Sequence, residues 1–208
     1  MATVLILGST SDIGVAIAKK FASQKFDIQL AARKPDQLEP LESDISIRYG
    51  VSCSVYAFDA LKYDGHPAFF NALSPIPDII VCVFGILDEE DLAFNDWAIT
   101  ERMINTNYTG AVSILNVAAK YYISQHKGTI IGISSVAGDR GRASKLIYAS
   151  AKAGFTTYLA GLRNKCFKEN VHVMTVQPGF VYTKMTENQP LPKAITSTPA
   201  EVADIIYT

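Results

Sequence analysis

Short apolar runs rich in β-branched residues alternate along the chain with longer stretches in which apolar residues recur every three or four positions. The runs predict strands, and the longer stretches predict amphipathic helices. The predicted strands are Val4–Leu7, Ile28–Ala32, Ser54–Phe58, Ile79–Phe84, Thr129–Ile133 and Val171–Val176. Regular alternation of strand and helix favours right-handed crossovers and a parallel sheet covered on both faces. We therefore expect a doubly wound α/β fold.

The end of the chain is less regular than the rest. Pro190–Pro199 contains three prolines and several Ser and Thr residues, which predicts a loop. The loop is either a lid over a pocket or a connection to a final helix that begins in Ala200–Thr208. Folds of this kind often continue with one more strand, so the pattern leaves open whether a C-terminal strand or helix is missing.

Length and composition suit one globular domain over residues 1–208. The chain is 49% hydrophobic and 19% charged, which is enough to bury a full core. A formal net charge of -1 with scattered Lys and Arg argues against nucleic acid or an anionic membrane as a partner and favours a small molecule. No apolar run approaches the roughly 18 residues that span a bilayer, and no basic leader precedes the first strand, so we expect a cytoplasmic protein.

The three cysteines, Cys53, Cys82 and Cys166, stand far apart without Cys or His neighbours at ligand spacing. Apolar surroundings are typical of buried thiols. We therefore expect neither a disulfide nor a metal site.

A glycine-rich turn follows the first predicted strand and opens the first helix: Gly8, Ser9, Thr10, Ser11, Asp12, Ile13 and Gly14. Glycines at such a turn let backbone N–H groups and the helix N-terminus approach a pyrophosphate, and the three hydroxyls add donors. Two glycines alone are equally compatible with an ordinary tight turn. A carboxylate beside a diphosphate would repel it, so we expect Asp12 to point away and to cap the helix. The turn makes the predicted sheet Rossmann-like.

The predicted second strand ends in Arg33 and Lys34, without the acidic residue that binds the ribose 2′-hydroxyl in NAD(H) folds. Arg33 suits a 2′-phosphate, which favours NADP(H), with NAD(H) as the alternative if Arg33 is only a solvated residue. Asp59, which ends the third strand, either accepts a hydrogen bond from an adenine amino group or is a turn residue.

Ser135, Tyr148 and Lys152 form a candidate proton-transfer set. Tyr148 and Lys152 are four residues apart, which puts both side chains on one face of a helix. A free phenol has a pKa of about 10, and a nearby cation lowers it into a range useful for acid–base catalysis. The spacing alone arises by chance in a chain with ten tyrosines, so its weight depends on its context.

Four segments in order resemble the motifs of the short-chain dehydrogenase/reductase family. They are the glycine-rich turn Gly8–Gly14, the helix asparagine in Asn107-Tyr-Thr-Gly110, the active site Ser134-Ser135 with Tyr148-Ala-Ser-Ala-Lys152, and Pro178-Gly179 through Thr183. Two segments depart from the family pattern. Asp12 replaces a glycine, and Cys82-Val83-Phe84-Gly85 stands where the family has Asn-Asn-Ala-Gly, although Gly85 still permits close backbone approach.

The resemblance implies an NAD(P)(H)-dependent oxidoreductase that interconverts a ketone and a secondary alcohol. It implies that Tyr148 is the acid or base, that Ser135 holds the substrate oxygen, and that Lys152 lowers the phenol pKa and binds the nicotinamide ribose. Asn107 would position a water that links the lysine to solvent. The implied coenzyme-binding residues are Gly8, Ser9, Thr10, Ser11, Asp12, Ile13, Gly14, Arg33, Asp59, Gly85, Tyr148, Lys152, Pro178, Gly179, Val181 and Thr183.

The resemblance also bears on partners. It implies a homodimer or homotetramer formed through the helices that carry Asn107 and Tyr148. The loop Asp139–Lys145 contains Arg140, Arg142 and Lys145 between two catalytic positions, so it either recognises an anionic group of the substrate or is a solvated loop or subunit contact.

Within the family, the chain resembles the keto-sugar reductase subunit of decaprenylphosphoryl-ribose epimerase. The likeness lies in Phe58-Asp-Ala-Leu61 with His66-Pro67, Phe84-Gly85, Asn107-Tyr-Thr109 with Ala111-Val-Ser113, and Ser134-Ser135 followed by Ala137-Gly138. It implies a sugar-like substrate. That reductase is linked with NADH, which argues against the assignment of Arg33 to the 2′-phosphate of NADP(H).

A rival hypothesis is a non-catalytic NAD(P) sensor or regulatory subunit, because a fold alone does not fix an activity. The altered segments at Asp12 and Cys82 favour it, whereas the complete set of Asn107, Ser135, Tyr148 and Lys152 argues against it. An isomerase or dehydratase of sugar nucleotides would need a longer C-terminal substrate region than this chain has.

Overall fold

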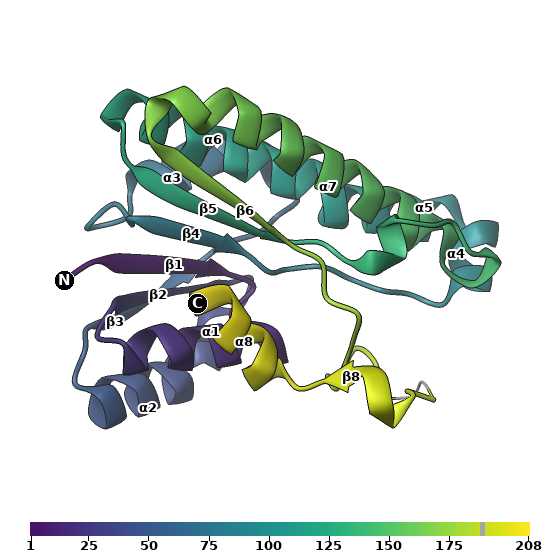
Figure 1. Cartoon of the computed structure of the whole chain (residues 1–208), viewed down its shortest axis with the longest axis horizontal. Helices are drawn as coiled ribbons and strands as arrows, with labels where there is room; N and C mark the ends of the chain where they lie inside the picture. The colour runs from purple at the N-terminus through teal and green to yellow at the C-terminus, as the bar shows by residue number, and fades with distance from the viewer. Residues whose placement is uncertain (188–189) are drawn as a thin grey trace. The chain divides into compact units, whose positions relative to one another are not determined.

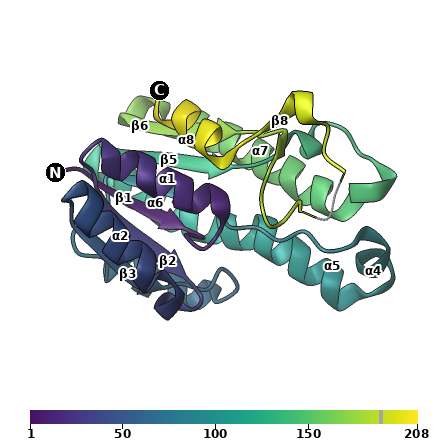
Figure 2. The same ribbon diagram turned by 90° about the horizontal axis from the view of Figure 1, so that it is seen from below.

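The computed structural model describes residues 1–187 and 190–208, which divide into two compact units. The first unit consists of Met1–Asp59, Asn71–Phe84 and Phe180–Thr208. The second unit consists of Ala60–Phe70 and Gly85–Gly179. Their helices and strands are labelled in Figures 1 and 2.

A parallel sheet forms the centre of the first unit (Figure 1). Its strands are β1 (Thr3–Leu7), β2 (Asp27–Ala32), β3 (Cys53–Ala57) and β4 (Ile79–Cys82). They lie in the order β3-β2-β1-β4, with Val4 of β1 opposite both Ile28 of β2 and Ile79 of β4. All of β1 is buried, since a central strand of a parallel sheet has no solvent-facing side.

Three helices lie on one side of this sheet (Figures 1 and 2). They are α1 (Asp12–Ser23), α2 (Glu39–Tyr49) and α8 (Pro199–Tyr207). α1 buries Ile17, Ala18 and Phe21 and packs against β1, β2 and α8. A short helical turn, η1 (Pro35–Leu38), leads into α2. α1 therefore turns one apolar face toward the core.

The segment before α8 is more ordered than predicted. Part of the predicted loop Pro190–Pro199 forms a helical turn, η7 (Lys193–Ile195), and a two-residue strand, β8 (Thr196–Ser197). β8 pairs in parallel with β7 (Phe180–Val181) of the same unit. The prediction of an irregular loop is wrong for these residues, because the pairing partner is distant in sequence and so invisible to a local pattern.

The second unit has a parallel pair of strands, β5 (Gly128–Ile133) and β6 (Val171–Val176). The long helix α7 (Leu146–Cys166) packs on β6, and Gly132 of β5 leaves room for Leu159 of α7. The other helices are α3 (His66–Asn71, whose last residue falls in the first unit), α4 (Glu90–Asn95), α5 (Trp97–Ile104) and α6 (Gly110–Gln125). Shorter turns are η2 (Tyr63–Gly65), the π-helical turn η3 (Asn105–Thr109), η4 (Val136–Gly138), η5 (Ala143–Lys145) and η6 (Phe167–Glu169).

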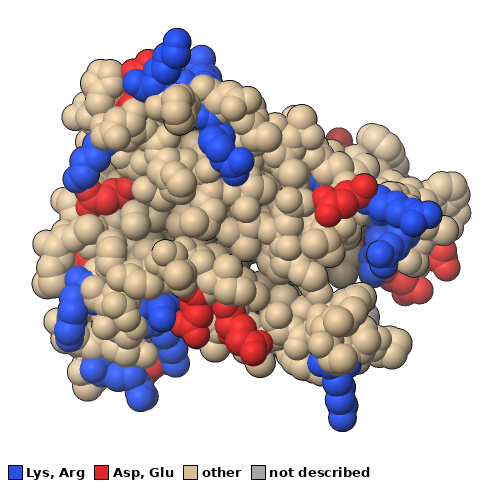
Figure 3. Space-filling view, viewed as in Figure 1, with Lys and Arg blue, Asp and Glu red and all other residues tan. Residues whose placement is uncertain are grey.

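All six predicted strands are present as β1 to β6, with the fourth ending at Cys82 rather than Phe84. None of the described helices is long and apolar enough to cross a membrane. On the face shown in Figure 3, small groups of Lys and Arg are separated by acidic side chains and by wide uncharged areas. That face therefore shows no continuous basic stripe.

Candidate active site

The glycine-rich turn of the first unit is held closely against its neighbours. Gly8 has a φ of +99°, and a Cβ there would stand 2.7 Å from the backbone nitrogen of Phe84. A Cβ on Gly14 would stand 2.7 Å from the carbonyl oxygen of Gly8. Both positions therefore require glycine, which leaves bare backbone where β1 passes into α1.

The hydroxyls of this turn differ in what they contact. Ser9 is buried, donates to the carbonyl of Ile6 at 2.7 Å and accepts from the N–H of Ala31 at 3.1 Å, so its hydroxyl belongs to the sheet. Ser11 is the N-cap of α1 and accepts from the N–H of Gly14 at 3.1 Å. Thr10 is exposed. Of the three hydroxyls predicted to donate to a pyrophosphate, that of Ser9 is thus already hydrogen-bonded to β1 and β2.

Asp12 does not cap the helix, which corrects the prediction. Ser11 is the capping residue, and the Asp12 carboxylate instead accepts a hydrogen bond from the backbone N–H of Lys184 at 2.7 Å. Asp12, Tyr182, Thr183 and Lys184 line a pocket of about 500 Å³ in the first unit. The negative charge that stands where the family has glycine is therefore bonded to the segment after β7.

The other coenzyme candidates of the first unit follow the strands. Arg33 is exposed directly after β2, and no ion pair is found for it within residues 1–187 and 190–208. Asp59 comes two residues after β3, whose end is held to β2 by the hydrogen bond from the N–H of Phe58 to the carbonyl of Ala32 at 2.9 Å. Arg33, Asp59 and the glycine-rich turn thus follow the carboxyl ends of neighbouring parallel strands. Ligands of open α/β sheets bind at this edge.

The effect of an added methyl group at Gly8 provides a test of this geometry. Gly8→Ala should lower the free energy of unfolding by about 2–4 kcal/mol, because the methyl group overlaps the backbone of Phe84 and the positive φ is unfavourable for alanine. Urea unfolding measures the change. Gly50→Ala is the matched control, since its φ is +63° but no atom lies within 4 Å of its Cβ position. A loss at Gly8 no larger than at Gly50 would contradict the close packing.

Ser135, Tyr148, Lys152 and Asn107 all belong to the second unit. Ser135 follows β5 and is the N-cap of η4, where its hydroxyl accepts from the N–H of Ala137 at 3.1 Å. Tyr148 and Lys152 lie on α7, and the Ser135 hydroxyl is near enough to Tyr148 to lower the pKa of its phenol. The structure therefore places the serine and the tyrosine of the predicted set close together.

Ser134 fastens the end of β5 to α7. Its hydroxyl donates to the carbonyl of Lys152 at 3.0 Å and lies 2.7 Å from the hydroxyl of Thr156. A Cβ on Gly138 would stand 2.7 Å from the backbone nitrogen of Ala153, so η4 also packs directly on α7. Sequence reasoning missed this supporting role of Ser134. The signal was Thr156, one helical turn beyond Lys152.

The pKa of Tyr148 is shifted in the direction opposite to the one expected. Burial raises the pKa of the phenol, and the hydrogen bond with Ser135 lowers it by less. Lys152 is buried, donates to the carbonyl of Ile133 at 3.0 Å, and its Nζ lies 5.8 Å from the centroid of the Tyr148 ring. Desolvation is therefore the larger influence on the phenol in the free protein, and the role of Lys152 in lowering its pKa stays a prediction.

Asn107 lies in the π-helical turn η3 and is buried. Its amide nitrogen donates to the carbonyls of Ile86 at 2.8 Å and Met103 at 2.9 Å, and its amide oxygen accepts from the N–H of Ile86 at 3.2 Å. Both N–H donors of the carboxamide are used by backbone carbonyls. A water held by this side chain would have to donate to the amide oxygen.

Gly85 lies beside both Asn107 and Lys152. A Cβ on Gly85 would stand 2.7 Å from the amide oxygen of Asn107 and 3.6 Å from the Nζ of Lys152. Its lack of a side chain leaves these two polar groups beside bare backbone. The departure at Cys82–Phe84 therefore preserves the one residue that this packing requires.

The Pro178-Gly179 segment lies against the turn that follows Ser135. The N–H of Val136 donates to the carbonyl of Pro178 at 3.2 Å. Val181 and Thr183, which follow in sequence, belong to the first unit, where the N–H of Thr183 donates to the hydroxyl of Thr186 at 3.1 Å. Val181 is buried in β7.

The loop between Ser135 and Tyr148 presents its cations to solvent. Arg140 and Arg142 are exposed and Lys145 is half-buried. None of the three forms an ion pair with any residue that the structure describes. Asp139 is engaged, since its carboxylate accepts from the amide of Gln177 at 2.7 Å.

Comparison with known proteins identifies the class. The family model described as short chain dehydrogenase matches residues 2–193. The chain belongs to this family of oxidoreductases, and its fold is the Rossmann-like, doubly wound parallel sheet that the sequence predicts.

Three individual proteins illustrate the relationship. An uncharacterized oxidoreductase of Mycobacterium tuberculosis (strain CDC 1551 / Oshkosh) is 32% identical over 97% of this chain and 82% of its own. The 3-oxoacyl-[acyl-carrier-protein] reductase of Aquifex aeolicus (strain VF5) is 28% identical over 97% of this chain and 87% of its own. A short-chain dehydrogenase from Sphingobium yanoikuyae in complex with NADPH shares the fold with a TM-score of 0.89 and 22% identity over 100% of this chain and 83% of its own. The likeness to the keto-sugar reductase of decaprenylphosphoryl-ribose epimerase is not shown and stays a prediction.

Proposed function

We propose that this chain is an NADP(H)-dependent oxidoreductase that interconverts a ketone and a secondary alcohol, with Tyr148 as acid and base. The observation that carries the proposal is that Ser135, which follows β5, lies near enough to Tyr148 to lower the pKa of its phenol, with Lys152 on the same helix as Tyr148. Two neighbouring hydroxyls can bind one carbonyl oxygen together and deliver a proton to it. Membership of an oxidoreductase family supports hydride transfer as the accompanying step.

The chain's own residues then handle the proton. Tyr148 donates it to the carbonyl oxygen, and its raised pKa keeps the phenol protonated at neutral pH, which favours reduction. Ser135 donates a hydrogen bond to the oxygen as negative charge develops there. The buried ammonium of Lys152 favours the phenolate that remains after the proton has left.

The first unit supplies the groups that would hold the coenzyme. The bare backbone at Gly8 and Gly14 and the N-terminus of α1 suit a pyrophosphate, and Arg33 without an ion-pair partner among the described residues suits a 2′-phosphate. The Asp12 carboxylate is hydrogen-bonded to the backbone N–H of Lys184 in the segment after β7. Bound NADPH supplies the hydride. The NADPH complex of the Sphingobium yanoikuyae protein supports this choice, with NAD(H) as the alternative.

Titration with NADPH and NADH, followed by nicotinamide fluorescence, tests the proposal. We expect NADPH to bind more tightly, and Arg33→Asp to weaken NADPH binding by about 10–100-fold while NADH binding is unchanged, because only NADPH carries the 2′-phosphate. Lys168→Asp is the control, since it makes the same change in net charge at an exposed position of the second unit. Equal binding of both coenzymes would contradict the assignment of Arg33 to the 2′-phosphate of NADPH.

Turnover is then assayed as NADPH oxidation with a panel of ketones that includes an acetoacetyl thioester and phosphorylated keto sugars. The 3-oxoacyl reductase among the relatives and the cations of the loop Asp139–Lys145 motivate these choices. Tight binding without turnover on the whole panel would favour the non-catalytic sensor. We also propose that residues 1–208 act as one domain and that the chain forms a homodimer or homotetramer through the helical segments that carry Asn107 and Tyr148.

A further inference from the structure

Glu90 is a buried carboxylate that the family motifs do not include. It is the first residue of α4 in the second unit, and only 7% of its surface is exposed. One carboxylate oxygen accepts a hydrogen bond from the backbone N–H of Ile147 at 3.1 Å. The other oxygen is buried without a hydrogen-bond partner among the residues that the structure describes.

The contact lies at the start of the helix that carries Tyr148. The first N–H groups of a helix have no partner within it and are usually bound by the side chain of the N-cap residue. The N-cap of α7 is Lys145, which provides no such hydrogen bond. Glu90 supplies the missing acceptor from another helix, at the residue next to Tyr148, and its negative charge suits the positive end of the helix dipole.

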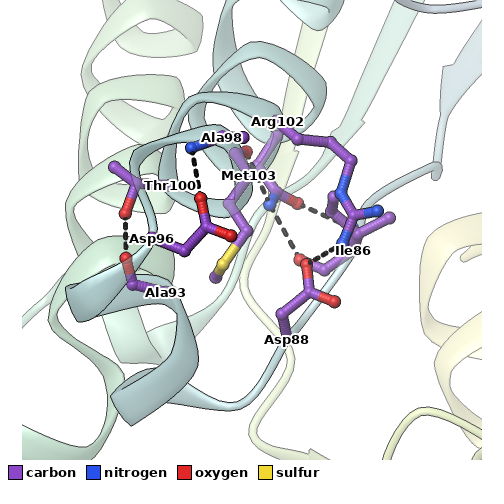
Figure 4. A network of polar contacts seen from close by, with 9 residues as sticks. Ile86, Asp88, Ala93, Asp96, Ala98, Thr100, Arg102 and Met103 are labelled. Carbon is purple, nitrogen blue, oxygen red and sulfur yellow. Dashed lines mark hydrogen bonds and ion pairs between the residues drawn. The ribbon is translucent and has the colours of Figure 1, made fainter.

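The element that presents Glu90 is held in place by several polar contacts (Figure 4). The Thr100 hydroxyl of α5 donates to the carbonyl of Ala93 in α4, and Asp96 caps α5 through the N–H of Ala98 at 2.8 Å. Asp88, just before α4, forms an ion pair with Arg102 of α5 at 2.9 Å. α4 also packs against α7. These contacts hold α4 in place, and with it the Glu90 carboxylate beside the N–H of Ile147.

Burial of the Glu90 carboxylate with only one of its two oxygens hydrogen-bonded among the described residues is unfavourable for stability. Burying a carboxylate with one hydrogen bond costs free energy, and an Asp, Ser or Thr at position 145 would cap α7 without that cost. We propose that Glu90 is a positioning residue: by capping α7 at Ile147 it fixes the first helical turn and so holds the Tyr148 phenol against Ser135. The catalytic part of this inference rests on the function proposed above, whereas the capping part does not.

Amide hydrogen exchange tests the capping part in the free protein. We expect Glu90→Ala to speed exchange of the Ile147 and Tyr148 amides by about fivefold or more, because the cap no longer protects the first turn of α7. Exchange in the middle of α7, around Phe155–Leu159, should be unchanged. Glu89→Ala is the matched control, because Glu89 is the exposed neighbour and makes no capping bond. Unchanged exchange at Ile147 in Glu90→Ala would overturn the proposal.

Kinetics test the consequence for Tyr148. We expect Glu90→Ala to lower kcat for ketone reduction about tenfold while the Kd for NADPH, read by fluorescence, stays the same. Glu90→Gln should recover most of kcat, because its amide oxygen still accepts from Ile147, and this variant also serves if Glu90→Ala fails to fold. A fall in thermal stability with unchanged kcat would overturn the positioning role. If the unsubstituted protein reduces no ketone, the proposed oxidoreductase function is contradicted. Amide exchange at Ile147 still tests whether Glu90 caps α7.

Discussion

Tyr148→Phe is expected to reduce the rate of ketone reduction by about a thousandfold or more, with NADPH bound as tightly as before. The substitution deletes the hydroxyl that lies near Ser135 and that would donate the proton, and it keeps the ring. A positioned acid contributes about 10²–10⁴-fold to a rate, and here the loss removes both the proton and one of two hydrogen bonds to the substrate oxygen. Steady-state NADPH oxidation and a fluorescence titration measure the two quantities separately.

Tyr158→Phe is the matched control for this experiment. Tyr158 lies on the same helix, and its hydroxyl donates to the side chain of Asn116 at 3.1 Å. The same atom is deleted ten positions further along α7, so the rate should be unaffected. Retained turnover in Tyr148→Phe would contradict the assigned acid.

The pH dependence of folding should report the same phenol. Because burial raises the pKa of Tyr148 above its unfolded value of about 10, the neutral phenol contributes stability that is fully present below pH 10. That contribution is lost as the pH rises through the higher folded pKa. The alkaline decline in the urea midpoint should therefore be less steep in Tyr148→Phe than in the unsubstituted protein.

The strands were predictable because their chemistry is local. Ile28–Ala32 is apolar except for Gln29 and is buried in a parallel sheet, and β2 covers it with one further residue, Asp27. The same holds for Thr129–Ile133, which β5 extends by Gly128. A strand buried on both faces consists mostly of consecutive apolar residues, and such a run can be recognised in the sequence without knowing which strand lies next to it.

Long-range contacts explain the predictions that were wrong. Asp12 was expected to cap α1, but its partner is the N–H of Lys184, 172 residues away. The Tyr148 pKa is a separate case: the effect expected from Lys152 stays a prediction, while in the free protein desolvation is the larger cause and raises the pKa. Spacing along a helix places two side chains on one face, but the distance between them and their exposure to water depend on the rest of the fold.

The burial of Glu90 also depends on a long-range contact and could not be predicted from the sequence. A glutamate in the acidic run Asp88–Asp91 has the sequence signature of a solvated surface, and Glu89 fits that description. Only the packing of α4 against α7 distinguishes Glu90 from its neighbour. The roles of Asn107, Ser135, Tyr148 and Lys152 stay predictions, although the structure places all four in the second unit.

Asn107→Ala is expected to lower the free energy of unfolding by about 2–4 kcal/mol and the melting temperature by roughly 5–15 °C. The substitution removes three hydrogen bonds of a buried carboxamide and leaves the N–H and the carbonyl of Ile86 without this partner. Buried polar groups left unpaired carry most of this cost. Calorimetry or thermal circular dichroism measures the change.

Asn105→Ala is the control for this substitution, because it lies in the same π-helical turn but offers one side-chain hydrogen bond, from the Thr109 hydroxyl at 3.2 Å, and is only half-buried. Its melting temperature should fall by no more than a few degrees. Because both Asn107 and Lys152 lie beside Gly85, Asn107→Ala should also impair turnover in the protein that remains folded at low temperature. Equal melting temperatures for the two variants would show that the carboxamide does not hold the segment at Ile86, and the expected effect on turnover would lose its structural basis.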